Sequence, residues 1–163
     1  PGAHGLLFLP YLSGERCPVN DPDARGAFVG ITALHTDGDF ARAVLEGVAF
    51  SLKQVAELME QMPGFKPQSE IVVSGGGSKS RLWRQIIADV FGLPVLQTYG
   101  AAEGGAFGAA LVAGAGCGLW ENLTSAMELL HVQDVTKPSK DAEKYQAPYQ
   151  RYCKLYQALQ ALE

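Results

Sequence analysis

The sequence predicts an α/β domain in which a mostly parallel β-sheet is flanked by helices. Strand and helix patterns alternate over residues 70–115, in the order strand, helix, strand, helix. A strand–helix–strand connection is right-handed and places its two strands parallel in one sheet. Ahead of these elements, apolar residues recur at helical spacing for about 23 residues from Asp39. A helix of that length runs about 35 Å, enough to cross one face of a sheet.

Two strands, a loop and this long helix are expected in residues 1–64. The mainly large, apolar segment Gly5–Leu12 predicts a buried extended segment, and the polar residues and prolines of 13–23 predict a loop. Small and large apolar residues alternate over Gly26–Ile31, as in a strand, although the two glycines lower its β propensity. The long helix is expected to stop at Pro63 and Gly64, which both disfavour helix.

The second half of the chain supplies the alternating elements. We expect a strand over Glu70–Ser74, a helix over Leu82–Phe91, a short strand at Val95–Leu96 and a helix from about Glu103 to Ala115. The uncharged run over residues 104–120 consists largely of Gly and Ala and is shorter than the roughly 20 apolar residues that a membrane span requires. It therefore predicts a closely packed interior helix.

From Ser125 onward the sequence is expected to be helical again. Four tyrosines recur at intervals of four, three and four residues, which places them on one stripe of a helix. They are Tyr145, Tyr149, Tyr152 and Tyr156. The stripe could serve as a ligand surface, but the favoured interpretation is packing of a closing helix, with the hydroxyls directed toward water.

Charge and metal-ligating residues exclude several functions. The formal net charge of −4 and the pI near 5.4 leave no basic face, so we expect no nucleic-acid partner. The three cysteines and three histidines are widely spaced, which predicts neither a disulfide framework nor a metal site and fits a reducing cytoplasm. These residues are Cys17, Cys117, Cys153, His4, His35 and His131.

The N-terminal residues give no targeting signal. Pro1 to His4 contain no basic segment followed by a long apolar run, so we expect a cytoplasmic protein without a membrane anchor. Because the first residue is not methionine, we also expect the chain to be a piece of a longer protein.

A glycine turn is the first candidate site. Gly75-Gly76-Gly77-Ser78-Lys79-Ser80 follows a predicted strand and opens into a helix. Glycines let a ligand approach the backbone, and a helix N-terminus offers unpaired N–H donors. The sequence matches neither the P-loop nor the GxGxxG pattern. Two interpretations stay open from the residues alone: a nucleotide-binding turn, or a turn that needs glycine only for positive φ.

A second junction of strand and helix lies at Thr98–Ala106. We expect Glu103 in the first helical turn, where an acid interacts favourably with the helix dipole, so a structural role is favoured over a catalytic one. The small residues that follow, Ala106, Gly108, Ala109 and Ala110, allow a close approach to a neighbouring element.

One extended pattern resembles the C-terminal signature of the FGGY family of carbohydrate kinases. It reads Gly26-x-Phe28-x-Gly30-Ile31, seven residues, then Asp39-Phe40-x-x-Ala43-Val44-Leu45-Glu46, and it fits at every constrained position. The loop before it, over residues 9–22, is similar to that of the xylulokinase members. Residues 74–89 resemble the family's adenosine motif, and residues 103–110 resemble the helix that follows.

The resemblance implies an ATP-dependent kinase of the actin-like ATPase superfamily, with two ribonuclease-H-like domains that close on sugar and nucleotide. Residues 1–163 would then be a partial C-terminal nucleotide-binding domain, truncated at its N-terminal strands, with an exposed sheet edge that favours self-association as a homodimer. Gly75, Gly76, Gly77 and Ser80 are carried over as adenosine-contacting positions. The implied aspartate base and the acid linked to Mg²⁺ belong to the N-terminal domain, so this chain is expected to hold no catalytic residue and no metal ligand.

For Glu15 and Arg16, in the loop similar to that of xylulokinases, we expect only pairing with each other or a part in shaping the cleft. The parent protein is expected to phosphorylate a ketopentose, such as D-xylulose, with ATP and Mg²⁺, while the isolated chain is inactive. Glycerol, gluconate, ribulose or another polyol or pentose remains an alternative substrate. A non-catalytic actin-like module that binds a partner through the Ala/Gly helix and the tyrosine stripe is an alternative of a different class.

Overall fold

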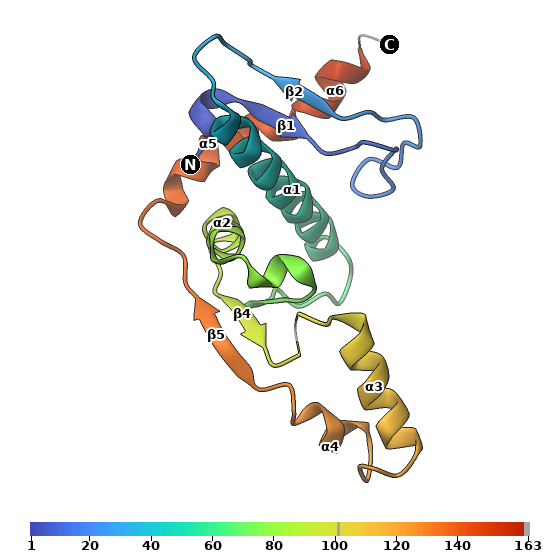
Figure 1. The fold of residues 1–163 in the computed structure, drawn as a ribbon. Helices are drawn as coiled ribbons and strands as arrows, with labels where there is room; N and C mark the ends of the chain where they lie inside the picture. The colour runs from blue at the N-terminus through green and yellow to red at the C-terminus, as the bar shows by residue number, and fades with distance from the viewer. Residues whose placement is uncertain (101, 162–163) are drawn as a thin grey trace. The chain divides into compact units, whose positions relative to one another are not determined.

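The computed structural model describes residues 1–100 and 102–161. These residues form two compact units that alternate along the chain. The first unit contains residues 1–67, residues 89–92 and the described part of 139–163, and the second contains residues 68–88 and 93–138. Figure 1 labels the elements of both units.

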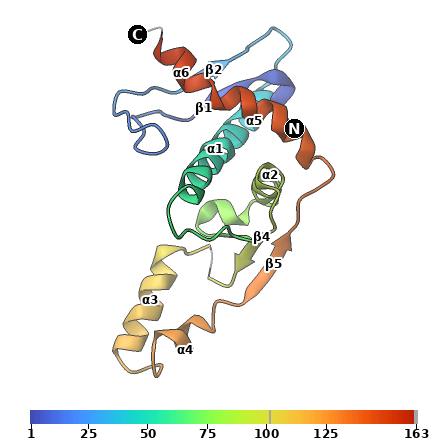
Figure 2. The ribbon, with the colours of Figure 1, turned by 180° about the vertical axis from the view of Figure 1, so that it is seen from behind.

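The first unit packs a long helix against a two-stranded sheet. Strands β1 (Leu7–Leu9) and β2 (Ala27–Val29) pair antiparallel. Helix α1 (Asp37–Glu60) lies against β1, and α5 (Gln146–Cys153) contacts both, as Figure 2 shows from behind. Three short helical segments complete the unit: η1 (Ala3–Gly5), η3 (Ala142–Tyr145) and α6 (Leu155–Gln160).

Helix α1 begins close to the expected residue because its first turn is capped. The carboxylate of Asp39 accepts hydrogen bonds from the backbone N–H and the hydroxyl of Thr36, both at 2.8 Å. These hydrogen bonds, aided by His4 at 2.7 Å, lower the pKa of Asp39 to about 2. The helix ends at Glu60, shortly before Pro63. The predicted long helix is therefore confirmed.

A buried carboxylate connects the N-terminal segment to α1. Glu46 is 2% exposed, and its two oxygens accept the N–H of Gly2 at 2.9 and 3.0 Å. Arg42 donates to Glu46 at 2.8 Å and to the hydroxyl of Tyr145 at 2.7 Å. Because a buried charge is tolerated only when it is paired and hydrogen-bonded, this network fixes Gly2, α1 and η3 to one another.

The tyrosine stripe packs inside the first unit. Phe50 of α1 contacts the rings of Tyr145, Tyr149 and Tyr152, with centroids 6.3, 5.6 and 5.4 Å away. The predicted packing role is confirmed, but the expectation that the hydroxyls face water is wrong for Tyr145 and Tyr152, whose side chains are buried. Three hydroxyls have polar partners in the same unit: Tyr145 with Arg42, Tyr149 with Glu57 and Tyr156 with Asp21.

The second unit contains a three-stranded mixed sheet with β4 at its centre. Strands β3 (Ile71–Val73) and β4 (Val95–Thr98) are parallel and are joined through α2 (Arg81–Phe91), as the alternating pattern predicts. Strand β5 (Val132–Thr136) adds antiparallel to the other side of β4. Helices α3 (Gly105–Gly116) and α4 (Leu123–Met127) lie side by side (Figure 1).

Two expectations about the sheets are wrong. Within the described residues only the β3–β4 strand pair is parallel, so one small sheet is antiparallel and the other is mixed, and neither is mostly parallel. In addition, residues 132–136 form strand β5 inside a tail that was expected to be helical. Two valines and a threonine in five residues favour a strand, and pairing with β4 stabilises it.

Helix α3 is not the closely packed interior helix that its composition predicts. Of its residues only Leu111 is buried, and the neighbouring Val112 is 59% exposed. A helix that is apolar around its whole circumference is normally covered on all sides, but here α4 is its main neighbour among the described elements. No helix in the described part of the chain is long and apolar enough to cross a membrane.

Helix α1 approaches β1 closely at Gly47, where an added Cβ would overlap the carbonyl oxygen of Phe8. We expect Gly47→Ala to lower the free energy of unfolding by about 1–3 kcal/mol, because rotation of a side chain cannot relieve an overlap with backbone. In the control, Gly38→Ala, the new Cβ makes ordinary contact with Thr36, so stability should be unchanged or rise by up to about 1 kcal/mol. Denaturant unfolding followed by circular dichroism measures both. A Gly47→Ala protein as stable as the parent would contradict the packing described.

Candidate functional site

The glycine turn connects β3 to α2 through one short helical segment. Gly75 has φ 78° and ψ −175°, a conformation open essentially only to glycine. The 3₁₀ segment η2 (Gly76–Lys79) follows, and Ser80 leads into the first residue of α2. The expectation that the turn needs a glycine with positive φ is met at Gly75.

The backbone of this turn is open to a ligand on one side. A Cβ added at Gly75 or Gly76 would meet no atom within 4 Å. At Gly77, an added Cβ would lie 3.3 Å from Nε1 of Trp83, so the indole borders this end of the turn. No side chain of the described residues therefore fills the space next to the first two glycines.

Arg84 of α2 holds the turn in place. Its side chain is buried and donates hydrogen bonds to the carbonyl oxygen of Ser78, to Thr136 Oγ1 at 3.3 Å and to Asp134 Oδ2 at 2.7 Å. The hydroxyl of Ser78 donates to the carbonyl oxygen of Gly75 at 2.7 Å. These bonds join the turn to α2 and β5, so the open backbone is tied to the rest of the second unit.

Ser80 has a structural task in addition to its predicted one. Its hydroxyl oxygen accepts the backbone N–H of Trp83 at 3.2 Å and so caps the N-terminus of α2. Ser80 remains exposed, and its O–H can still donate to a ligand. A contact between Ser80 and adenosine therefore stays a prediction.

The second junction predicted from sequence lies beside the first. A Cβ added at Gly104 would be 3.5 Å from the backbone nitrogen of Gly75. A cavity of about 430 Å³ borders this junction, with Tyr99 and Phe107 in its wall. Glu103 lines the same cavity but lies before Gly104, the N-cap of α3, so its expected place in the first helical turn is wrong by a residue or two.

Glu15 and Arg16 lie in the first unit. The carboxylate of Glu15 bonds backbone N–H groups instead of the Arg16 side chain. Glu15 accepts the backbone N–H groups of Arg16 and Cys17 at 2.8 and 3.2 Å, which stabilises the loop after β1. No ion pair between Glu15 and Arg16 is found among the described residues. Within the same residues, no group of three His, Cys, Asp or Glu side chains is placed to hold a metal ion.

The anchoring role of Arg84 was not predicted from the sequence. The available signal was its position among the apolar residues of α2, where a charged side chain must find partners if it is buried. Its partners lie about 50 residues later, on a strand that the sequence pattern did not predict.

We expect Arg84→Met to lower the free energy of unfolding by about 2–4 kcal/mol, because it removes charge-assisted hydrogen bonds inside the second unit. Arg81→Met, an exposed arginine on the same helix, is the matched control and should change stability by less than about 0.5 kcal/mol. Denaturant unfolding measures the stabilities, and amide hydrogen exchange at Gly76 and Gly77 reports the turn itself. Equal effects of both substitutions would show that Arg84 does not anchor it.

Comparisons of sequence place this chain beside sugar kinases. A family model described as "FGGY family of carbohydrate kinases, C-terminal domain" matches residues 1–117. A xylulose kinase of Staphylococcus epidermidis is 40% identical over 159 residues, which cover 97% of this chain and 31% of that protein. A gluconokinase of Bacillus subtilis is 47% identical over 92 residues, 56% of this chain and 18% of that protein. The chain spans about a third of the length of the xylulose kinase.

Comparisons of structure also match this chain to kinases of a sugar and of a polyol. The crystal structure of ligand-bound xylulose kinase from Lactobacillus acidophilus matches 98% of this chain and 32% of its own, with a TM-score of 0.82 and 35% sequence identity. The structure of Plasmodium falciparum glycerol kinase with ADP matches 94% of this chain and 31% of its own, with a TM-score of 0.73 and 25% identity.

Proposed function

Because the chain belongs to the FGGY family of carbohydrate kinases, we propose that its second unit binds the adenosine part of ATP or ADP at the glycine turn. The proposed contact residues are Gly75, Gly76, Gly77 and Ser80. The observation that carries the proposal is the open backbone at Gly75 and Gly76, where no atom would meet an added Cβ within 4 Å. A nucleotide can therefore approach the main chain closely.

Two further features of the turn suit a nucleotide. The N-terminus of α2 presents N–H donors and the positive end of the helix dipole, which both favour a negatively charged ligand. The indole of Trp83 beside Gly77 offers an aromatic surface of the kind on which bases stack. Because Arg84 fixes the turn, little ordering of the backbone is needed when a ligand binds.

The proposed reaction of the whole protein is transfer of the ATP γ-phosphate to a sugar hydroxyl. Catalysis of this kind depends mainly on positioning and on stabilising charge. This chain would contribute the nucleotide-binding wall, while the base and most sugar contacts would come from residues outside it. We propose that Mg²⁺ enters with the nucleotide and is held by its phosphates and by that other part of the protein, so the chain alone is expected to be inactive.

D-Xylulose is the sugar we propose, with xylulose 5-phosphate as product. The support is the xylulose kinase that is 40% identical over nearly the whole chain. Gluconate is the second candidate, because the gluconokinase shares 47% identity over a shorter segment.

Binding of ADP to the chain tests the nucleotide site. Gly76→Val should weaken binding roughly tenfold, because the new side chain occupies the open space while its backbone needs no positive φ. Titration calorimetry measures the affinity, and quenching of Trp83 fluorescence reports a ligand at the turn. Gly116→Val at the far end of α3, where an added Cβ also meets nothing, is the control and should leave affinity unchanged. Equal affinity in the Gly76→Val variant would reject the site.

The choice of sugar is tested on the full-length protein. With ATP and Mg²⁺, we expect kcat/KM for D-xylulose to exceed that for gluconate, glycerol and ribulose, measured by coupled detection of ADP. A higher kcat/KM for gluconate would replace our choice with the second candidate. Phosphorylation of none of these sugars would reject both.

A further inference from the structure

A cavity beside the edge strand β5 shares no residue with the proposed nucleotide contacts. Its volume is about 360 Å³, within the roughly 300–1,000 Å³ of small-molecule pockets. It is lined by Arg81 and Gln85, one turn apart on α2, and by residues 134–137, which end β5 and follow it. All of these residues belong to the second unit.

Two cations line this cavity without an acidic partner. Arg81 and Lys137 are exposed, and their side chains form no ion pair or hydrogen bond among the described residues. The backbone of Lys137 is nevertheless fixed, because its carbonyl oxygen accepts a hydrogen bond from the side-chain amide of Gln85 at 3.0 Å. Like charges that line one cavity repel each other, so an anion that reaches both stabilises the pair.

The carboxylate in the wall of the cavity does not balance these charges. Asp134 Oδ2 accepts a hydrogen bond from the buried Arg84 at 2.7 Å, and Asp134 Oδ1 accepts the backbone N–H of Val135 at 2.9 Å. The ion pair with Arg84 neutralises this carboxylate inside the fold. Although the chain as a whole has a formal net charge of −4, the cavity is therefore cationic.

A hydroxyl in the lining adds a neutral donor. Thr136 lines the cavity and is 9% exposed, and its Oγ1 accepts a hydrogen bond from Arg84 at 3.3 Å. A threonine hydroxyl that accepts one bond still has its own proton to donate. No acceptor for that proton is found among the described residues, so a ligand oxygen would complete the bonding of Thr136.

From the two cations without partners, the neutralised carboxylate and the spare hydroxyl donor, we propose that this cavity binds a phosphoryl group, either inorganic phosphate or the phosphate of a small ester. Such a group carries about two negative charges near neutral pH, which matches Arg81 and Lys137. The planar guanidinium of Arg81 can donate to two phosphate oxygens at once, and Lys137 supplies the second charge. Phosphate oxygens accept hydrogen bonds, which suits a lining whose carboxylate is already occupied.

The site is independent of the glycine turn, so a protein that fails to bind ADP is still expected to bind phosphate. In particular, Gly76→Val should bind inorganic phosphate as the parent does. Adenosine, which has no phosphate, should not displace it.

Titration of the ¹⁵N-labelled chain with inorganic phosphate tests the site. We expect the backbone N–H signals of Val135 and Lys137 and the side-chain amide signals of Gln85 to shift together in ¹H–¹⁵N NMR spectra, with one dissociation constant. Phenyl phosphate should produce the same shifts, while phenol should produce none. Tighter binding of phenyl phosphate would identify an ester as the ligand, and tighter binding of inorganic phosphate would identify the free ion.

Arg81→Gln and Lys137→Gln should each weaken phosphate binding roughly three- to tenfold, because each removes one charge-assisted contact. Their melting temperatures should match that of the parent, because neither side chain has a partner in the fold. Lys79→Gln is the matched control. It removes the same charge from an exposed residue of the second unit outside the cavity and should leave the affinity unchanged.

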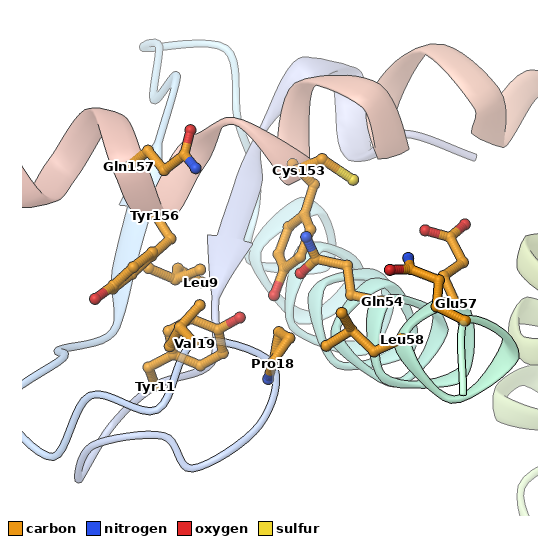
Figure 3. A pocket seen from close by; sticks show the side chains of 12 residues that line it. Leu9, Tyr11, Pro18, Val19, Gln54, Glu57, Leu58, Cys153, Tyr156 and Gln157 are labelled. Carbon is orange, nitrogen blue, oxygen red and sulfur yellow. The ribbon is translucent and has the colours of Figure 1, made fainter. Parts of the chain in front are cut away.

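A cavity of the first unit provides an internal control in the same spectra. Its volume is about 250 Å³, and no lysine, arginine or histidine is among its lining residues, all of which lie in the described part of the chain. Figure 3 shows the amides of Gln54 and Gln157 at this cavity. Because it offers no cation, phosphate should leave the side-chain signals of both glutamines in place.

Four results would overturn the proposal. Absence of shifts at Val135, Lys137 and Gln85 would show that phosphate does not enter the cavity. Equal weakening by Lys79→Gln would indicate general attraction of charge, and loss of phosphate binding in Gly76→Val would place the ion at the glycine turn. If Arg81→Gln and Lys137→Gln weakened ADP binding as much as Gly76→Val does, the cavity would belong to the nucleotide site.

Discussion

The buried guanidinium of Arg84 is the constraint on which the second unit depends. It joins the carbonyl oxygen of Ser78 in the glycine turn to Thr136 and Asp134 on β5. A buried cation is costly unless its donors find acceptors, and here acceptors come from two segments that lie far apart in the sequence, at Ser78 and at residues 134–136. One side chain therefore fixes both the edge strand of the sheet and the exposed backbone offered to a nucleotide.

The elements that the sequence predicts well have local causes. Helix α1 follows from an apolar stripe and from the Thr36–Asp39 cap, and the parallel pair β3–β4 follows from the strand–helix–strand order. Strand β5 and the exposure of α3 have causes that are not local. The five residues of β5 pair with a strand that lies more than 30 residues earlier, and the surroundings of an all-apolar helix cannot be read from its own composition.

The candidate site likewise has features that the sequence reveals and features that it does not. The three glycines stand out in the sequence because glycine readily adopts a positive φ, and the φ of Gly75 is positive, at 78°. The contacts that hold the turn depend on Arg84, whose partners could not be identified from spacing. Likewise, the tyrosine stripe predicts packing, but nothing in its period identifies Glu57 and Asp21 as the partners of the Tyr149 and Tyr156 hydroxyls.

The alternation of the two units along the chain has a consequence for biosynthesis. Phe50 of α1 takes its ring contacts from Tyr145, Tyr149 and Tyr152, which leave the ribosome about a hundred residues later. The first unit therefore stays open, with Phe50 uncovered, while residues 68–138 are being translated. Those residues form the second unit mainly among themselves. The second unit can therefore fold before the first, although its residues are translated after α1.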